Sequence, residues 1–276
     1  MSRAPSSPVG AEWWGEVDIP MGETMRWQVG PLCLWVQRLP GEWCVAQTQL
    51  EDPLHALVEA KRSVTAEDID ENAYVERFGV RGDSTVFRIA PQLADRPVVS
   101  RPDRPFHLPA GEEAVLFVGS PLWILMSTES PRRALMDTPV FRPSDTWFGP
   151  TNHDGELCYA SRTFCRLRIE EVPLRPHRCV TAVTVRNHAD DDLPLDRLKL
   201  PVDALALYRG DDGRLWTQDL HLDRHEDKEH ARLTISKKNP ALASRPRCLG
   251  TARVPTQVNV MTRAFSTLFS LGGDDG

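Results

Sequence analysis

The sequence predicts a mostly β protein made of two β-sandwich-like domains with a short C-terminal helix. The first observation is that 23 prolines recur along the 276 residues, which leaves little room for long helices because proline interrupts them. The second is that short apolar segments alternate with turn-forming residues, as the strands of a sandwich do. With 41% hydrophobic and 26% charged residues, the chain has the composition of a globular protein.

The length is sufficient for two domains of ordinary size. We divide the chain into a disordered tail (residues 1–10), an N-terminal β domain (residues 11–139), a C-terminal β-sandwich domain (residues 140–255), and an amphipathic helix with a tail (residues 256–276). The tail is assigned from its serine- and proline-rich composition, because such terminal segments lack the apolar residues needed for packing.

The N-terminal domain begins with a predicted hairpin. Residues 25–36 are dense in Trp, Val and Leu and contain a turn at Gly30 and Pro31, and residues 42–47 are the expected partner strand. Leu54, Leu57 and Val58 have helical spacing, which predicts a short helix at this point. Further strands are expected over residues 85–89 and 114–127.

In the C-terminal domain, the alternation of apolar and charged residues predicts a half-buried strand over residues 165–170, where Cys165 and Leu167 alternate with Arg166 and Arg168. Apolar segments separated by turns predict further strands over residues 180–187, 198–202, 204–208, 215–222 and 233–235. This spacing of short strands is typical of a sandwich.

The predicted C-terminal helix has one apolar face. That face comprises Met261, Phe265, Leu268 and Phe269, next to Val260 and Ala264. Asn259 is a suitable N-cap and Gly272 a suitable stop. The apolar face fits two interpretations: packing on the chain's own sandwich, or docking of a protein partner.

Composition and motifs exclude several classes of function. A net charge of −6 argues against a general nucleic-acid-binding protein. The first residues lack the apolar core of a signal peptide, and no apolar run is long enough to span a membrane, so we expect a cytoplasmic protein. The six cysteines form no C-x-x-C pair. No catalytic, cofactor or metal motif is spelled out, and we assign no catalytic residue, cofactor or metal ligand.

The most informative segment is residues 140–177, which combine aromatic, polar and basic side chains. The candidate binding residues for a ligand or partner are Arg142, Trp147, Phe148, Asn152, Arg162 and His177. An aromatic platform beside forked guanidinium donors suits an anion or a sugar. The alternative is an inter-domain joint in which Trp147 and Phe148 pack into a core.

Four segments resemble an uncharacterised prokaryotic domain-of-unknown-function family of similar length. They read Phe-Arg-Pro-Ser-Asp-Thr-Trp-Phe-Gly-Pro (141–150), Gly-Glu-Leu-Cys-Tyr-Ala-Ser-Arg (155–162), Val-Pro-Leu-Arg-Pro-His-Arg (172–178) and Asp-Gly-Arg-Leu-Trp-Thr (212–217). Members of that family are often encoded beside small-conductance mechanosensitive channels, so the resemblance implies a soluble channel-associated protein. It brings no activity and no catalytic residue.

Two hypotheses of function follow. The first is a non-enzymatic, soluble binding or interaction protein whose partner is a protein, for example the cytoplasmic part of a mechanosensitive-type membrane channel. The second is a small-ligand binding protein for an anion or carbohydrate, or a sugar-active enzyme, that uses the region from Arg142 to Arg178.

Overall fold

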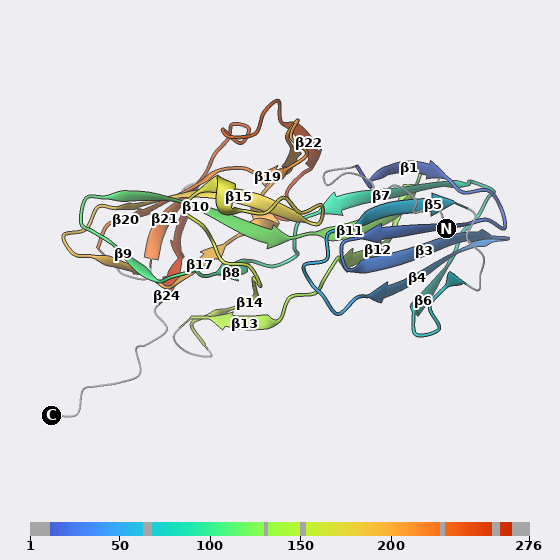
Figure 1. The fold of residues 1–276 in the computed structure, drawn as a ribbon, viewed down its shortest axis with the longest axis horizontal. Helices are drawn as coiled ribbons and strands as arrows, with labels where there is room; N and C mark the ends of the chain where they lie inside the picture. The colour runs from blue at the N-terminus through green and yellow to red at the C-terminus, as the bar shows by residue number, and fades with distance from the viewer. Residues whose placement is uncertain are drawn as a thin grey trace, which may run out of the picture.

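The computed structural model describes residues 12–62, 68–129, 132–149, 153–226, 230–255 and 260–266. The predicted tail over residues 1–10 lies outside this part of the chain. The structure is 54% strand and 3% helix, which confirms the mostly β class. The strands gather into two lobes along the long axis of the molecule (Figure 1).

The N-terminal lobe contains two antiparallel sheets. The first has the order β5-β2-β3-β4-β6 and comprises β2 (Thr24–Val29), β3 (Leu32–Leu39), β4 (Glu42–Gln49), β5 (Val58–Arg62) and β6 (Tyr74–Gly79). The second has the order β1-β7-β11-β12 and comprises β1 (Gly15–Asp18), β7 (Val86–Gln92), β11 (Trp123–Glu129) and β12 (Arg132–Pro139). The rings of Trp43 and Phe87, one from each sheet, lie 5.1 Å apart between their centroids.

The predicted hairpin over residues 25–47 is present as β2, β3 and β4, and Gly30 takes the positive φ (56°) that its turn requires. The short helix predicted near Leu54 is wrong. Val58 instead begins β5, which pairs with β2. Val58 is β-branched and pairs with Val29 across the strands, and this packing outweighs the local helical spacing.

The C-terminal lobe contains a large sheet, a smaller sheet and a two-stranded pair. The large sheet has the order β22-β18-β19-β15-β20-β21-β23, with β10 paired to β15. Its strands are β10 (Glu113–Pro121), β15 (Arg178–Asn187), β18 (Leu207–Arg209), β19 (Leu215–Thr217), β20 (Leu220–Arg224), β21 (His230–Ile235), β22 (Arg247–Gly250) and β23 (Val260–Arg263).

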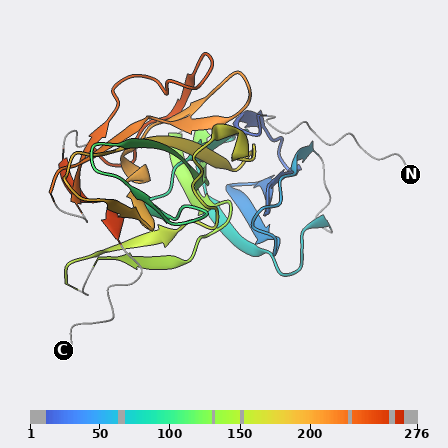
Figure 2. The ribbon, with the colours of Figure 1, turned by 60° about the vertical axis from the view of Figure 1, so that its left-hand side comes forward.

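The smaller sheet has the order β13-β14-β8-β17-β24, and β16 pairs with β9 beside it. These strands are β8 (Val98–Ser100), β9 (Phe106–Leu108), β13 (Asp145–Phe148), β14 (Glu156–Ala160), β16 (Leu193–Leu195), β17 (Arg197–Leu200) and β24 (Phe265–Ser266). Figure 2 shows the yellow-green β13–β14 hairpin along the lower margin of the lobe. Two 3₁₀ turns, η2 (Ile169–Glu171) and η3 (Val202–Ala204), complete the described elements.

The chain passes between the lobes more than once. β10 pairs with β15 along its whole length, whereas β11, which follows after Leu122 alone, pairs with β7 and β12. Strands β8 to β10 therefore belong to the C-terminal lobe although they precede residue 139. The chain crosses from one lobe to the other between β7 and β8, between β10 and β11, and between β12 and β13. A single boundary at residue 139 therefore does not divide the strands between the two lobes.

The predicted C-terminal helix is wrong for the residues that the structure describes. Met261 lies in β23, which pairs with β21, and Phe265 lies in β24, which pairs with β17. The apolar spacing arises because two consecutive strands enter different sheets, so Phe265 is buried while Met261 is 60% exposed. Leu268 and Phe269 lie outside the described residues. No helix among the residues described is both long and apolar enough to cross a membrane.

Candidate functional site: an arginine pocket

The structure separates the predicted site residues into two groups. The first group lies on and before β13, at the edge of the smaller sheet. Phe148 is buried, with the guanidinium of Arg197 5.4 Å from its ring centroid. Trp147 is 39% exposed, and Arg142 forms a salt bridge of 3.1 Å with Asp145.

Phe148 therefore packs within the C-terminal lobe, in a small cluster with Val99 and Cys158. It does not form a joint between the lobes. Asn152 lies outside the described residues.

The second group lies where the lobes meet. Trp13 Nε1 donates to the carbonyl of Pro176 (2.9 Å), and His177 Nε2 donates to the carbonyl of Pro53 (3.3 Å). His177 is 1% exposed, and a Cβ at Gly30 would lie 2.4 Å from its Nδ1. The joint interpretation thus applies to the segment around His177, and Gly30 is needed both for its positive φ and for this close approach.

Burial lowers the pKa of His177 to about 3, and the positive charges of Arg178 and Arg175 add to this effect. The imidazole is therefore neutral at physiological pH. A neutral, buried histidine suits packing at a joint better than proton transfer.

A loop beside the joint forms the wall of a cavity. The alternation over residues 165–170 predicted a strand, but only Cys165 and Arg166 make isolated bridges, to Pro102 and Phe117. The amide of Phe117 donates to the carbonyl of Arg166 (2.7 Å), and the amide of Arg166 donates back (3.0 Å). After these bridges the chain turns away, and Leu167 is 53% exposed.

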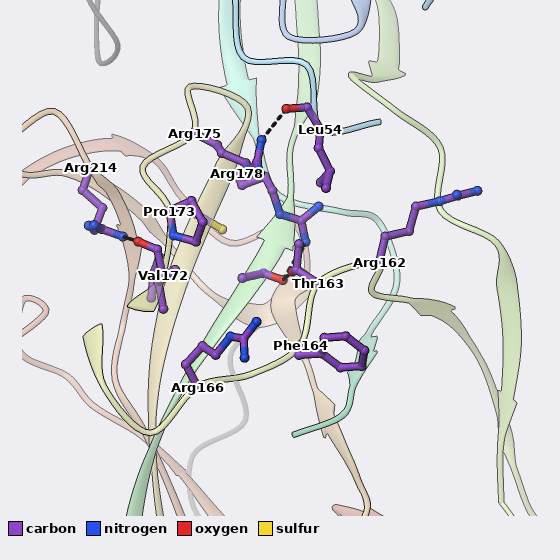
Figure 3. Close-up of a pocket in the computed structure, with 13 residues that line it drawn as sticks. Leu54, Arg162, Thr163, Phe164, Arg166, Val172, Pro173, Arg175, Arg178 and Arg214 are labelled. Atoms are coloured by element: carbon purple, nitrogen blue, oxygen red, sulfur yellow. Dashed lines mark hydrogen bonds between the residues drawn. The ribbon is translucent and has the colours of Figure 1, made fainter. Parts of the chain in front are cut away.

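This loop, β10, β15 and the start of β19 enclose a cavity of about 260 Å³ (Figure 3). The lining residues are Leu54, Gly119, Arg162, Thr163, Phe164, Arg166, Val172, Pro173, Arg175, Arg178, Cys179, Val180 and Arg214. Five of them are arginines, and none is an aspartate or a glutamate. We call this cavity the arginine pocket.

Arg178 forms the floor of the arginine pocket. Its Nη2 donates to the carbonyl of Gly119 (2.9 Å), to Ser161 Oγ (3.2 Å) and to Thr163 Oγ1 (2.7 Å). All three acceptors are neutral. Among the residues that the structure describes, its Nε and Nη1 make no hydrogen bond and no carboxylate lies within salt-bridge distance, so two donor groups remain available to the cavity.

Burial lowers the pKa of Arg178 to about 10, and the charge of Arg175 lowers it further. The guanidinium still carries its proton at neutral pH. A positive charge that is half-buried and has no counter-ion is only partly hydrated, and an anion in the cavity would stabilise it.

The other four arginines are held in different ways. Arg166 forms a salt bridge of 2.7 Å with the exposed Asp103, and Figure 3 shows its guanidinium directed toward the middle of the pocket. Arg214 donates to the carbonyl of Val172 (3.0 Å).

Arg175 donates to the carbonyl of Leu54, which connects the pocket to the N-terminal lobe. Arg162 extends away from the others (Figure 3), with its guanidinium 4.9 Å from the ring centroid of Phe141. Of the predicted residues, Arg162 is therefore at the rim.

Cys179 also lines the pocket, but it is not a nucleophile at neutral pH. Burial raises the pKa of its thiol to about 12, against the lowering effect of Arg178. A reactive cysteine needs an accessible thiolate, so the chemistry that this pocket supports is the binding of an anion.

Sequence reasoning assigned Arg162 and His177 but not Arg166, Arg175, Arg178 or Arg214 as site residues. Arg175 lies inside the candidate segment and Arg178 directly follows it, and their charge was the available signal. Arg214 comes from a separate turn before β19, and no local pattern connects it with the others.

A search of curated proteins found no match to this chain, and a search of solved structures found none either. One family model matches residues 13–270, and its description reads "Protein of unknown function (DUF432)". The match covers both lobes and the whole arginine pocket. It confirms the resemblance to an uncharacterised family, and the chain belongs to the family DUF432.

Proposed function

We propose that this protein binds a small anionic ligand, with a phosphate, sulfate or carboxylate group, in the arginine pocket. The observation that supports the proposal is Arg178, a half-buried guanidinium that has only neutral acceptors and two uncommitted donor groups. A guanidinium offers forked donors that match the oxygens of such an anion.

The net charge of the lining residues also favours an anion. Arg162, Arg175 and Arg178 have no carboxylate partner among the described residues, and only Arg166 and Arg214 lie within 4.0 Å of one. With about 260 Å³, the pocket has room for one anionic group and a small organic body. Phe164, which is 49% exposed, supplies an apolar wall for that body.

Isothermal titration calorimetry with inorganic phosphate tests the proposal. The full chain should bind phosphate, and Arg178→Gln should weaken binding about tenfold or more, because a charge-assisted hydrogen bond contributes ~1.5–3 kcal/mol. Arg142→Gln is the matched control, since Arg142 is an exposed arginine paired with Asp145 and does not line the pocket.

Equal phosphate affinity for Arg178→Gln and the unaltered protein would contradict the proposal, provided that both melt at similar temperatures. Methyl glucoside serves as the neutral comparison. Preferential binding of this sugar, lost in Trp147→Ala but kept in Arg178→Gln, would instead support a carbohydrate site around β13.

A second candidate function is interaction with a protein partner, such as the cytoplasmic part of a membrane channel. The supporting observation is β6, which lies at the edge of its sheet and pairs only with β4 among the described strands. Its Tyr74 and Val75 are 60% and 49% exposed. An exposed edge with apolar side chains suits the addition of a strand from another chain.

Pull-down from membranes of the native cell tests this second candidate. A channel recovered with the unaltered protein should be lost when Val75→Lys blocks the edge, because charged edge residues oppose strand addition. Retention of the channel by Val75→Lys, in a protein that folds normally, would exclude β6 as the docking edge.

A further inference from the structure

A second cavity of about 420 Å³ lies between the two main sheets of the C-terminal lobe. Its walls come from β14, β17, η3, β21 and β23, with Pro97 and residues 254–255 at its margin. The lining residues are Pro97, Glu156, Lys199, Pro201, Asp203, Ala204, Leu233, Ile235, Val254, Pro255, Val260 and Thr262. Most of these side chains are apolar, and none of them lines the arginine pocket.

The charges in this cavity leave one carboxylate without a partner. Lys199 is the only cation among the described residues that line the cavity, and its Nζ forms a salt bridge of 2.8 Å with Glu156. Asp203 forms no salt bridge with any residue that the structure describes. The nearby Arg253 directs its guanidinium to Asp137 and to the carbonyl of Leu93.

Asp203 is held firmly in place. Its carbonyl accepts hydrogen bonds from the amides of Arg253 (2.8 Å) and Val254 (3.2 Å). One carboxylate oxygen, Oδ1, is buried and has no hydrogen-bond partner. A buried acceptor without a donor is unfavourable, but Oδ1 has no surface open to the cavity. The second carboxylate oxygen, Oδ2, is not buried in this way and makes no salt bridge with a described residue, so it is the atom that can accept a hydrogen bond from a ligand in the cavity that Asp203 lines.

We propose that this cavity binds an apolar primary ammonium compound, whose ammonium group donates to Asp203 Oδ2 and whose hydrocarbon body packs against Leu233 and Ile235. The lysine already present illustrates the chemistry, because its ammonium group lies between the Glu156 carboxylate and the ring of Phe148, 5.7 Å from the ring centroid. A ligand ammonium would give Asp203 the counter-ion that Lys199 gives Glu156.

The pKa of Asp203 supports the same assignment. Burial raises this pKa and the nearby charge of Glu156 adds to the increase, while the backbone amides of Asp203 and Ala204 and the charge of Lys199 act in the opposite direction without cancelling it. The carboxylate is therefore poorly compensated by its surroundings, and a bound cation would stabilise its charged form.

Calorimetric titration of the full chain with benzylammonium and with benzyl alcohol tests the proposal, since the two probes have the same shape and differ in charge. The unaltered protein should bind benzylammonium at least about tenfold more tightly, which corresponds to ~1.4 kcal/mol. Asp203→Asn should abolish this preference.

Asp219→Asn is the matched control. Asp219 also has a buried Oδ1 without a partner and a pKa raised by burial, but it does not line the cavity. It should retain the preference for benzylammonium. Equal affinity for the two probes, an unchanged preference in Asp203→Asn, or no measurable binding of benzylammonium would overturn the proposal, and a water molecule would then be the donor to Asp203.

Discussion

The C-terminal lobe contains two cavities whose charges are opposite. In the arginine pocket, Arg178 is a half-buried cation whose hydrogen bonds go only to neutral acceptors. In the second cavity, Asp203 is an anion with a buried oxygen that has no partner. The two proposed ligands therefore have opposite charges, and in each cavity the feature that supports the proposal is a charge without an ionic partner among the described residues.

Two other arginines, Arg38 and Arg224, are buried and have a structural role, and their hydrogen-bond partners differ from those of Arg178. Arg38 is fully buried and donates to four carbonyls, those of Ser84, Leu39, Glu42 and Gly82. Arg224, also fully buried, pairs with Asp191 and donates to Asn187. The protein itself supplies acceptors for the guanidinium groups of Arg38 and Arg224, whereas two donor groups of Arg178 have no acceptor among the described residues.

The largest expected effect is on the free energy of unfolding, which should fall more when a structural arginine is replaced than when Arg178 is replaced. Arg38→Met should lower the free energy of unfolding by about 3 kcal/mol or more, because it removes a fully buried guanidinium together with its four hydrogen bonds to carbonyls. Urea denaturation followed by circular dichroism measures this. Arg178→Met should cost clearly less, and a larger loss for Arg178→Met would remove the distinction between the two arginines.

The next largest effect is the pH dependence of stability that arises from His177, a buried side chain that is neutral in the folded protein. His177 has a folded-state pKa of about 3 against 6.5 for the ordinary group, so the unfolded chain binds more protons between these values. Stability should therefore decrease as pH falls from about 6.5 toward 3, by up to about 1.4 kcal/mol per pH unit.

Melting temperatures measured across this range check the prediction about His177. In His177→Gln the dependence should be shallower, because the substitution removes the buried titrating group. An equally steep loss in His177→Gln would show that other groups cause the acid sensitivity.

A smaller effect is expected where the backbone supports Arg178. A Cβ at Gly119 would lie 3.1 Å from Thr163 Oγ1 and 3.6 Å from Arg178 Nε. Gly119→Ala should therefore displace the guanidinium slightly and weaken phosphate binding several-fold, or ~1 kcal/mol. Gly250→Ala is the control, because its nearest contact there would be an ordinary 3.6 Å. Unchanged phosphate affinity in Gly119→Ala would argue against this support.

The smallest expected effect is on the melting temperature when Asp203, in the second cavity, is replaced. Because burial raises the pKa of Asp203, its ionisation opposes folding, and the lost stability appears as pH rises through the ordinary aspartate value. Asp203→Asn should therefore raise the melting temperature at pH 7 slightly and leave it unchanged at strongly acid pH. A lower melting temperature for Asp203→Asn at pH 7 would mean that the carboxylate has a partner in the folded protein.

Much of the fold could be predicted from the sequence, because it rests on local patterns. The hairpin formed by β2, β3 and β4 follows from apolar segments around Gly30. The strand predicted over residues 165–170 is absent. Cys165 and Arg166 each form one isolated β-bridge, and the 3₁₀ turn η2 begins at Ile169. Alternation alone does not distinguish a strand from an extended loop held at two points.

The C-terminal helix was predicted wrongly for a different physical reason. Val260 and Phe265 are five residues apart and belong to strands in two separate sheets. Their spacing matches one face of a helix, yet each is held by a different partner strand. Long-range pairing decided the structure here.

The candidate site could be predicted only in part, because it depends on contacts between distant segments. Arg162 and His177 lie at the arginine pocket and at the joint, respectively, while Trp147 and Arg142 belong to the edge of the smaller sheet. Arg214 reaches the pocket through the pairing of β15 with β19. Asp203 carries no sequence signal, because its importance arises from burial.

The most direct test of the arginine pocket is nuclear magnetic resonance of the arginine Nε–H groups during titration with inorganic phosphate. The resonance of Arg178 should shift in a saturable manner, while those of Arg38 and Arg224 remain in place because the protein already occupies their donors. Arg178→Lys assigns the Arg178 signal by its loss. A phosphate titration in which Arg178 does not move, or moves no more than Arg38 and Arg224, would contradict the account.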